Sequence, residues 1–258
     1  MNRFNRPRLI TQGDPAYQRH VAQMLLQRAN QRAMQPPSQR DLFGGEVESV
    51  LRNALAARFT LSDRRILEYE ERIGRNWQRK YRELDAVVVD GQARIHVFEI
   101  KASRRAGALH RAFRQLRDTR AILMLAFPSV STSILLVDTG IITQAERAEL
   151  AAAPDAPERL PQTLAEAIAE HEDLRRVESL VNLQSFPTAI ELAVLSVDDV
   201  VALADGVPLS LDWDADEAAE VEPSLPTDEE PLYSTSEADE VESPFAAAFR
   251  KANQGRKR

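Results

Sequence analysis

The chain contains no cysteine among its 258 residues. This absence excludes disulfide bonds and metal sites that are built from thiolates. The N-terminal residues lack the apolar core of a secretory signal, and the longest apolar run, residues 121–127, is far too short to cross a bilayer. The sequence therefore predicts a cytoplasmic protein with no membrane partner.

Several common catalytic patterns are also missing. The four histidines show no paired spacing that would build a zinc site, no serine lies in a Gly-x-Ser-x-Gly turn, and no Gly-x-x-x-x-Gly-Lys phosphate loop occurs. His96 lies within a β-compatible run, where we expect a core or rim histidine. These absences argue against a zinc enzyme, a serine hydrolase of this type and a nucleotide-driven motor.

Lysine is scarce, with 4 lysines against 29 arginines. One of the few, Lys101, closes the triplet Glu99-Ile100-Lys101. A lysine ammonium is a compact point charge whose pKa shifts readily, whereas arginine is larger and always charged. A lysine next to Glu99, in a chain that otherwise uses arginine, suggests a role that arginine does not fill.

The net charge of −7 hides a division of the chain. Residues 1–150 carry a balance of +9, whereas residues 151–258 carry a balance of −16. A basic first part suits a polyanionic substrate, although a basic face can also be merely solvated. The segment 205–242 contains 14 acids and no lysine or arginine, so we expect it to be disordered.

Hydrophobic periodicity and turn residues predict the order of elements. We expect an N-terminal arm (1–40), a core (41–140), a helical extension (141–205) and a disordered acidic tail (206–258) that ends in a basic amphipathic segment (245–258). The predicted helices are 17–34, 46–59, 106–123, 144–153, 164–182 and 187–203, and the predicted strands are 66–73, 81–89, 94–102 and 133–138.

Two acids and a lysine lie on neighbouring predicted strands. Asp85 is on one strand, and Glu99 and Lys101 are near the end of the next. Mg²⁺ takes oxygen ligands, usually one or two carboxylates together with water and substrate phosphate, and a nearby ammonium can orient the attacking water. These residues predict metal-assisted hydrolysis of a phosphodiester.

The order of the core elements resembles that of the PD-(D/E)XK nuclease superfamily, which includes restriction endonucleases, junction resolvases and exonucleases. Residues 44–140 carry the resemblance, with Asp85 and the Glu99-x-Lys101 triplet at the motif positions. The resemblance implies an α/β fold with a restriction-endonuclease-like αβββαβ core, in which helices flank a mixed sheet. To this core we add the helical C-terminal extension and the acidic tail.

The resemblance also implies roles for individual residues in a nuclease that uses Mg²⁺, with Mn²⁺ as a substitute. The first core helix of the family supplies a further acid, which matches Glu48 in its setting of Gly44 and Leu51, with Glu46 as the alternative. Many members carry a glutamine after the motif, which matches Gln115. The implied metal ligands are Glu48, Asp85, Glu99 and the Ile100 carbonyl, and the implied catalytic residues are Asp85, Glu99, Lys101 and Gln115.

A basic flank accompanies the predicted helix 106–123. Its basic side chains recur about once per turn and could hold phosphates beside a metal site, so we expect DNA as the partner. A solvated surface is the alternative. The candidate nucleic-acid-binding residues are Arg104, Arg105, His110, Arg111, Arg114 and Arg117.

Alternative functions stay open at this stage. Leu84 stands where the family's proline would precede the acid, and no aromatic residue closely follows Gln115. A nuclease fold that only binds DNA, within a defence, repair or recombination assembly, is therefore the rival reading, and an enzyme that acts on RNA is a third. The sequence does not decide base specificity, endonucleolytic or exonucleolytic mode, or whether the chain forms a homodimer. The tail could recruit a protein partner.

The turn between the two central strands offers a geometric test. A two-residue turn that begins at Asp90 would direct Asp85 and Glu99 to opposite faces of the sheet. A loop with an odd number of residues pairs Asp85 with Val97 and places it on the same face as Glu99. We therefore predict a three- or five-residue loop, with Gly91 or its neighbour in a left-handed conformation, or a bulge.

Overall fold

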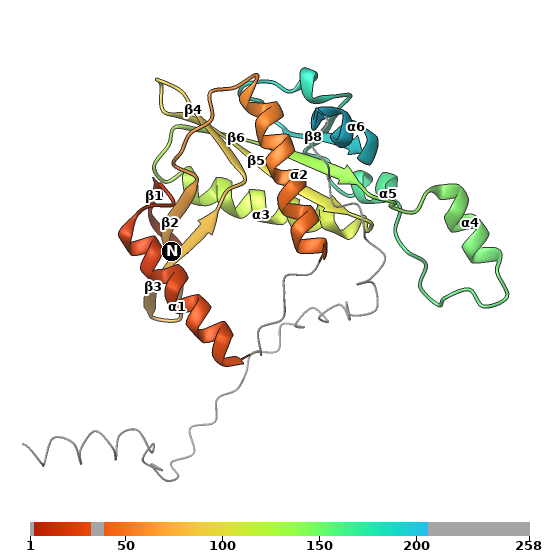
Figure 1. The fold of residues 1–258 in the computed structure, drawn as a ribbon, viewed down its shortest axis with the longest axis horizontal. Coiled ribbons are helices and arrows are strands. Elements are labelled where there is room, and N and C mark those ends of the chain that lie inside the picture. The colour runs from red at the N-terminus through yellow and green to blue at the C-terminus, as the bar shows by residue number, and fades with distance from the viewer. Residues whose placement is uncertain (1–2, 32–38, 206–258) are drawn as a thin grey trace, which may run out of the picture. The chain divides into compact units, whose positions relative to one another are not determined.

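The computed structural model describes residues 3–31 and 39–205, all within one compact unit (Figure 1). No helix among these residues is long and apolar enough to cross a membrane. The predicted acidic tail, its basic end and the end of the predicted helix 17–34 lie outside the described residues. The elements are β1 (Phe4–Ile10), α1 (Pro15–Gln31), α2 (Gln39–Ala56), β2 (Ile66–Ile73), β3 (Asn76–Glu83), β4 (Ala86–Val89), β5 (Arg94–Ser103), α3 (Gly107–Leu123), β6 (Ser129–Asp138), α4 (Gln144–Ala152), α5 (Leu164–Ala169), β7 (Leu174–Val177), η1 (Leu180–Asn182), β8 (Ile190–Ser196) and α6 (Val197–Leu203).

A mixed sheet of five strands contains most of the core. Its order is β4-β5-β6-β8-β7, with β4 antiparallel to β5 and the other neighbours parallel. Helices α3 and α5 cover one face, and α2 and α6 cover the other. Strands β5 and β6 are buried along almost their whole length, as expected for strands covered on both faces. The chain is therefore α/β, as the sequence predicted.

A second, antiparallel sheet contains β1, β2 and β3 in that order. The sequence predicted no strand in the N-terminal arm, so β1 is a correction. β1 is polar, so the sequence shows no apolar pattern of a strand there. The strand is instead stabilised by contacts across the sheet, since Arg8 donates two hydrogen bonds of 3.0 and 2.9 Å to Glu68 on β2. Phe4 and Leu9 pack against the core on the α3 side of the structure.

The strand predicted at 81–89 is in fact two strands in different sheets. β3 ends at Glu83 and β4 begins at Ala86, so the chain changes sheets at Leu84 and Asp85. Leu84 is buried, and its N–H donates to the Arg65 carbonyl over 2.9 Å, which ties the crossing to the start of β2. The crossing places Asp85 at the end of β4 that is nearest the second sheet.

Helix α2 begins earlier than predicted. The sequence placed its start after Gly44 and Gly45, but the helix runs from Gln39 through both glycines. A glycine in a helix interior costs about 1 kcal/mol relative to alanine, which weakens a helix without ending it. The apolar residues that follow, including Val47 and Leu51, are fully buried and supply the compensating contacts.

The extension 141–205 is not wholly helical, which corrects another prediction. Residues 174–177 and 190–196 form β7 and β8, and both strands join the main sheet. A short apolar run cannot be assigned to helix or strand by periodicity alone. Ser196 and Asp199 form a capping box that starts α6 at Val197, and this local signal separates the strand from the helix.

His96 lies in the core, as its position in a strand suggested. It is fully buried, and its ring nitrogens contact the Ser185 carbonyl (2.7 Å) and the Ser133 hydroxyl (2.8 Å). Burial lowers the pKa of His96 to about 4, although the Ser185 contact opposes this shift. The folded protein therefore keeps His96 neutral in a range where the unfolded chain binds a proton.

We expect the buried neutral His96 to make stability fall in acid. Above pH 6.5 both states are neutral and His96 has no effect. Between pH 6.5 and about 4, the free energy of unfolding should fall by about 1.4 kcal/mol per pH unit from this residue. Urea unfolding of wild type and His96→Gln across this range measures the difference. His20→Gln, on α1, is the control and should follow wild type, and equal pH slopes for wild type and His96→Gln would contradict the assignment.

Candidate active site

The hairpin between β4 and β5 has the odd loop that the sequence predicted. Val89 pairs with Ile95, and the Asp90 N–H donates to the Arg94 carbonyl over 3.1 Å, which leaves three residues in the loop. The Asp90 carboxylate accepts from the Arg94 N–H (2.8 Å) and closes the loop. The left-handed residue is Ala93 (φ 56°), and not Gly91 or its neighbour as predicted.

This register places two acids on one face of the sheet. The ladder begins with Ala86 opposite Phe98, so its continuation by one residue sets Asp85 opposite Glu99. The sequence predicted Val97 as the partner of Asp85, two residues away, and only the shared face of the two acids is as expected. Because side chains alternate along a strand, both acids project toward the face that α3 covers.

Glu99 is the most buried acid of the site, with 1% of its side chain exposed. The Lys101 Nζ lies 2.5 Å from Glu99 Oε1, and the Gln115 Nε2 of α3 donates to Oε2 over 2.8 Å. Burial raises the pKa of Glu99 to about 7, and the Asp85 carboxylate adds to this rise while the Lys101 ammonium opposes it. The site therefore holds two like charges that a nearby cation would stabilise.

Asp85 is tied to the backbone of β5. Its Oδ2 accepts a hydrogen bond of 2.6 Å from the Ile100 N–H, the residue between Glu99 and Lys101. Burial raises the pKa of Asp85, and the Ile100 N–H and the Lys101 ammonium lower it in part. Asp85 is partly buried, and so is less enclosed than Glu99.

Lys101 remains a cation in this arrangement. Burial works to lower the pKa of Lys101, but the Glu99 carboxylate, together with Asp85 and Glu48, outweighs it, so that the pKa is raised. The side chain is 35% exposed, so the ammonium contacts Glu99 and still reaches the surface. It can donate hydrogen bonds to a water molecule or to a phosphate oxygen.

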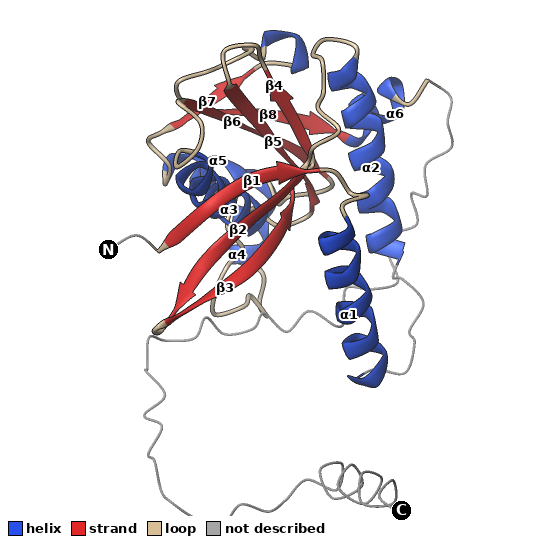
Figure 2. Cartoon of the chain, turned by 90° about the vertical axis from the view of Figure 1, so that its left-hand side faces the viewer, coloured by secondary structure: helices blue, strands red, loops and turns tan. Residues whose placement is uncertain are grey.

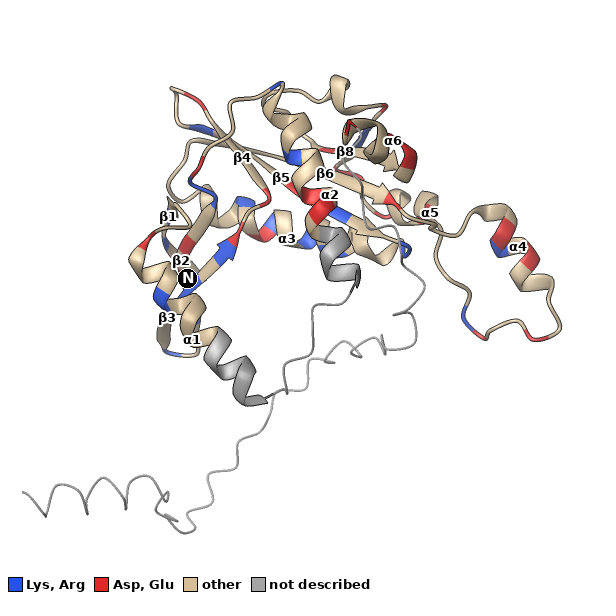
Figure 3. Cartoon of the chain, in the orientation of Figure 1, with Lys and Arg blue, Asp and Glu red and all other residues tan. Residues whose placement is uncertain are grey.

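Glu48 belongs to the same electrostatic cluster, although α2 covers the opposite face of the sheet. Burial raises the pKa of Glu48, and the Asp85 carboxylate is the next largest contribution. The Arg65 guanidinium lies 3.5 Å from Glu48 and 2.7 Å from Glu83. This coupling to Asp85 favours Glu48 over Glu46 as the helix acid. Figure 3 shows the acidic positions on α2.

Two arginines of the site were not predicted. Arg65 is only 13% exposed and connects Glu48 with the end of β3. Arg82 on β3 donates to the Gln115 carbonyl (3.0 Å) and to the Thr119 hydroxyl (2.7 Å), which fixes α3 at the level of Gln115. Both act through contacts between residues distant in the sequence, so no local pattern distinguishes them from the other arginines.

Two of the three acids of the site, Asp85 and Glu99, are arranged so that they could bind a divalent cation together. Among the described residues, no three His, Cys, Asp or Glu side chains are grouped closely enough to hold a metal ion. Glu48 is turned toward Arg65, which leaves Asp85 and Glu99 as the opposed pair. Two carboxylates with water and substrate phosphate are a common oxygen donor set for Mg²⁺. The donor set therefore suits Mg²⁺ or Mn²⁺.

The structure separates the predicted basic flank into two groups. Arg111 lies one helical turn before Gln115 and so is on the flank of α3 that faces the site. His110 is on the other flank, where its ring contacts His171 (2.8 Å) and Gln162 (3.0 Å). The exposed arginines at the start of α3 and along it are Arg104, Arg105, Arg111 and Arg114.

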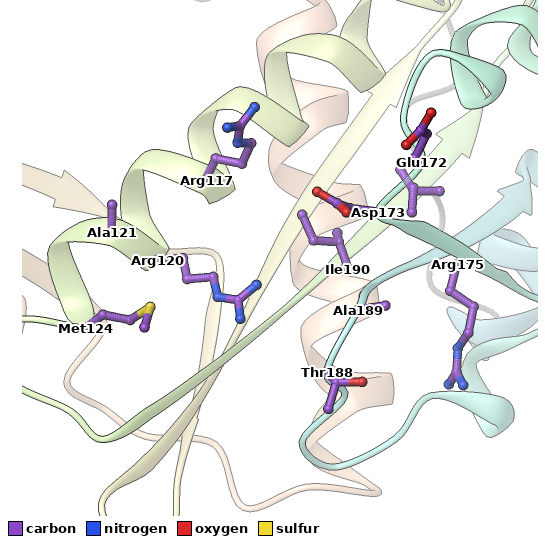
Figure 4. A pocket seen from close by; sticks show the side chains of 11 residues that line it. Arg117, Arg120, Ala121, Met124, Glu172, Asp173, Arg175, Thr188, Ala189 and Ile190 are labelled. Atoms are coloured by element: carbon purple, nitrogen blue, oxygen red, sulfur yellow. The ribbon is translucent and has the colours of Figure 1, made fainter.

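Arg117 lines a cavity of about 590 Å³ with Arg120 of α3 (Figure 4). The opposite wall comes from residues around the starts of β7 and β8, including Asp173 and Arg175. Because β7 and β4 are at opposite edges of the sheet, this cavity is distant from Asp85. Arg117 therefore lies on the side of α3 that faces this cavity, and its contact with a phosphate stays a prediction.

No family model matches the chain, and a search of curated proteins found no significant match.

Proposed function

We propose that the protein is a Mg²⁺-dependent nuclease that hydrolyses phosphodiester bonds in DNA. One observation carries the proposal: Asp85, Glu99 and Lys101 share one face of the β4–β5 hairpin, and Gln115 joins them from α3. Burying two carboxylates side by side is costly unless a cation or hydrogen bonds compensate. Lys101, Gln115 and the Ile100 N–H compensate in part, but burial still raises the pKa of both acids, so a bound divalent cation would stabilise the pair further. The resemblance to PD-(D/E)XK nucleases supports the same reading.

The acids of the site would hold the metal ion in the proposed reaction. Mg²⁺, held by Asp85 and Glu99 together with water and substrate phosphate, would supply positive charge at the scissile phosphate and make a bound water more acidic, while Glu48 adds negative charge close to Asp85. Asp85 is positioned for this by the Ile100 N–H. The carbonyl oxygen of Ile100 is the remaining candidate ligand for the metal ion.

Lys101 acts on the attacking water and the phosphate. Its ammonium is anchored to Glu99 Oε1 and is 35% exposed, so its other N–H groups can orient a water or stabilise charge on a phosphate oxygen. Gln115 holds the second oxygen of Glu99 and keeps this carboxylate in one orientation. Arg82 in turn positions Gln115 through its backbone carbonyl.

DNA is the substrate that the surrounding charge favours. Residues 1–150, which contain the site, carry a balance of +9. The exposed arginines 104, 105, 111 and 114 continue from the end of β5, two residues after Lys101, onto α3. Basic side chains that contact phosphates supply most of the sequence-independent affinity for DNA.

A cleavage assay tests this function. The purified full chain is incubated with plasmid, linear duplex and single-stranded DNA, and with RNA, in Mg²⁺, Mn²⁺ or EDTA. We expect cleavage of at least one DNA substrate in either metal and none in EDTA. Absence of cleavage on every substrate, with DNA binding retained, would favour a subunit that only binds DNA, and cleavage restricted to RNA would reassign the substrate.

A further inference from the structure

The hairpin of β2 and β3 ends in an exposed turn at one end of its sheet. The two strands pair over eight residues each, from Ile66 opposite Glu83 to Ile73 opposite Asn76. A two-residue turn joins them, and Gly74 at its first position has φ +61°. Figure 2 shows β2 and β3 running away from the five-stranded sheet toward this turn. All residues of the tip, 73–79, are exposed.

The tip is basic and contains two large exposed apolar side chains. Residues 72–80 include four arginines and lysines and no acid. Trp77 is 44% exposed and Ile73 is 47% exposed. Trp77 pairs across the strands with Arg72, and Arg79 follows two residues later on the same face. Trp77 therefore presents an exposed aromatic ring that has basic side chains next to it on the same face.

The charges along the hairpin change from its base to its tip. The acids of β2 are paired with arginines at the start of the chain, Glu68 with Arg8, Glu70 with Arg6 and, closest to the tip, Glu71 with Arg3, so these charges offset one another. At the tip, Arg75 makes no ion pair with any described residue, and Arg79 is 3.7 Å from Glu68. The excess of positive charge is therefore greatest at the exposed end.

We propose that the tip of the β2–β3 hairpin binds a single-stranded segment of the DNA substrate. Trp77 presents a ring for stacking on an unpaired base, and Arg75 and Arg79 contact the neighbouring phosphates. Stacking on aromatic side chains combined with basic residues is how proteins hold single strands without sequence preference. This inference rests on the proposed function, because it assigns the substrate's contact away from the site of cleavage.

The geometry sets the distance between this contact and the site of cleavage. Trp77 is six residues before Glu83, the last residue of β3, and Asp85 follows two residues later. At about 3.3 Å per strand residue, the eight residues from Trp77 to Asp85 span at most about 26 Å. A nucleic-acid strand with the 3.4 Å rise of a duplex covers this length in roughly eight nucleotides, so a 20-mer is long enough to reach both contacts.

The first test follows Trp77 by fluorescence. The chain has two tryptophans, so Trp213→Phe leaves Trp77 as the sole reporter. Addition of a single-stranded 20-mer in EDTA, where no cleavage occurs, is expected to quench the emission of Trp77 and to protect it from acrylamide. Unchanged emission at a concentration that saturates the protein, or no binding of the 20-mer at all, would overturn the proposal.

The second test compares binding by variants. Trp77→Ala should weaken binding of the single-stranded 20-mer about tenfold, and Trp77→Phe, which keeps a ring, should retain most of it. Met124→Ala is the control, since Met124 is also a large exposed apolar residue (56%) but lies after α3. Circular dichroism checks that each variant is folded. Equal affinities for wild type and Trp77→Ala would contradict the stacking role.

The third test uses the salt dependence of binding. The double substitution Arg75→Gln with Arg79→Gln should reduce the slope of log K against log salt by about 1.4, because each phosphate contact on a single strand contributes about 0.7. The control removes the same charge at Arg159 and Arg176, which are exposed in the C-terminal part of the fold. An unchanged slope for the tip variant would refute the phosphate contacts.

These outcomes are separable from failure of the proposed function. Wild type that cleaves DNA but binds it equally well without the tip side chains would retain the nuclease proposal and remove the hairpin proposal. If the protein never cleaves DNA but its binding of the 20-mer depends on Trp77, the hairpin proposal is retained and the nuclease proposal is removed.

Discussion

Glu99→Gln is expected to abolish cleavage and to leave the protein at least as stable as wild type. Removal of a metal ligand costs several kcal/mol of transition-state stabilisation, so the rate should fall by about 10³-fold or more. The stability change has the opposite sign to that of an ordinary core substitution. Burial and Asp85 raise the pKa of Glu99 to about 7, so its carboxylate destabilises the fold when ionised.

The gain in stability should depend on pH in a defined direction. An acid with a raised pKa in the folded state reduces stability above its unfolded pKa of 4.5, and the full loss is present above pH 7. Without metal, Glu99→Gln should therefore raise the free energy of unfolding by up to about 3 kcal/mol at pH 8 and by little at pH 4.5. Urea unfolding at the two pH values measures this difference.

Glu191→Gln is the matched control for Glu99→Gln. Glu191 is also fully buried, but it pairs with Arg175 and accepts a hydrogen bond of 2.9 Å from the Gln184 N–H. Glu191→Gln removes a charged hydrogen-bond partner from Arg175, whose side chain is 48% exposed, and weakens the acceptor of the Gln184 N–H, so this variant should lose about 1–3 kcal/mol of stability and keep its cleavage rate while folded. The account of Glu99 would be wrong if both variants lost stability equally or if Glu99→Gln still cleaved DNA.

Lys101→Arg is expected to lose most of the activity although the charge is kept. The Lys101 ammonium is 2.5 Å from Glu99 Oε1, and the second oxygen of Glu99 accepts a hydrogen bond from Gln115 of α3. An arginine places a planar fork there and directs its N–H groups differently. Loss of one donor that stabilises the transition state costs about 10²–10³-fold in rate, which single-turnover cleavage with saturating enzyme measures.

Lys80→Arg is the control for Lys101→Arg. Lys80 is a partly exposed lysine of β3 that forms no ion pair with any described residue, and the replacement keeps its charge. It should leave cleavage and DNA binding unchanged. If Lys101→Arg cleaves DNA at a rate within about threefold of wild type, only the charge of Lys101 matters. The proposed role of Lys101 in orienting the attacking water would then be wrong.

The parts of the site that the sequence predicted depend on local patterns. Glu99 and Lys101 are two residues apart on one strand, so their shared face follows from the strand period. Gln115 was expected on a helix whose apolar residues repeat at helical spacing, and α3 places it 2.8 Å from Glu99. The odd loop that joins β4 and β5 could be predicted because face alternation allows few registers.

The parts that the sequence did not predict depend on contacts between distant residues. Strand β1 is polar and is stabilised by ion pairs across about 60 residues, such as Arg8 with Glu68. Strand β8 is short and apolar, and its pairing with β6 decides between helix and strand. Arg65 and Arg82 gain their roles only when β2, β3, α2 and α3 come together.

Location of the metal tests the central claim most directly. Crystals of wild type and of Glu99→Gln are soaked with Mn²⁺, and the anomalous difference density is compared. The account predicts a Mn²⁺ peak at the carboxylates of Asp85 and Glu99 in wild type and no peak at this position in Glu99→Gln. A wild-type peak elsewhere, or none at the Mn²⁺ concentration that supports cleavage, would contradict it.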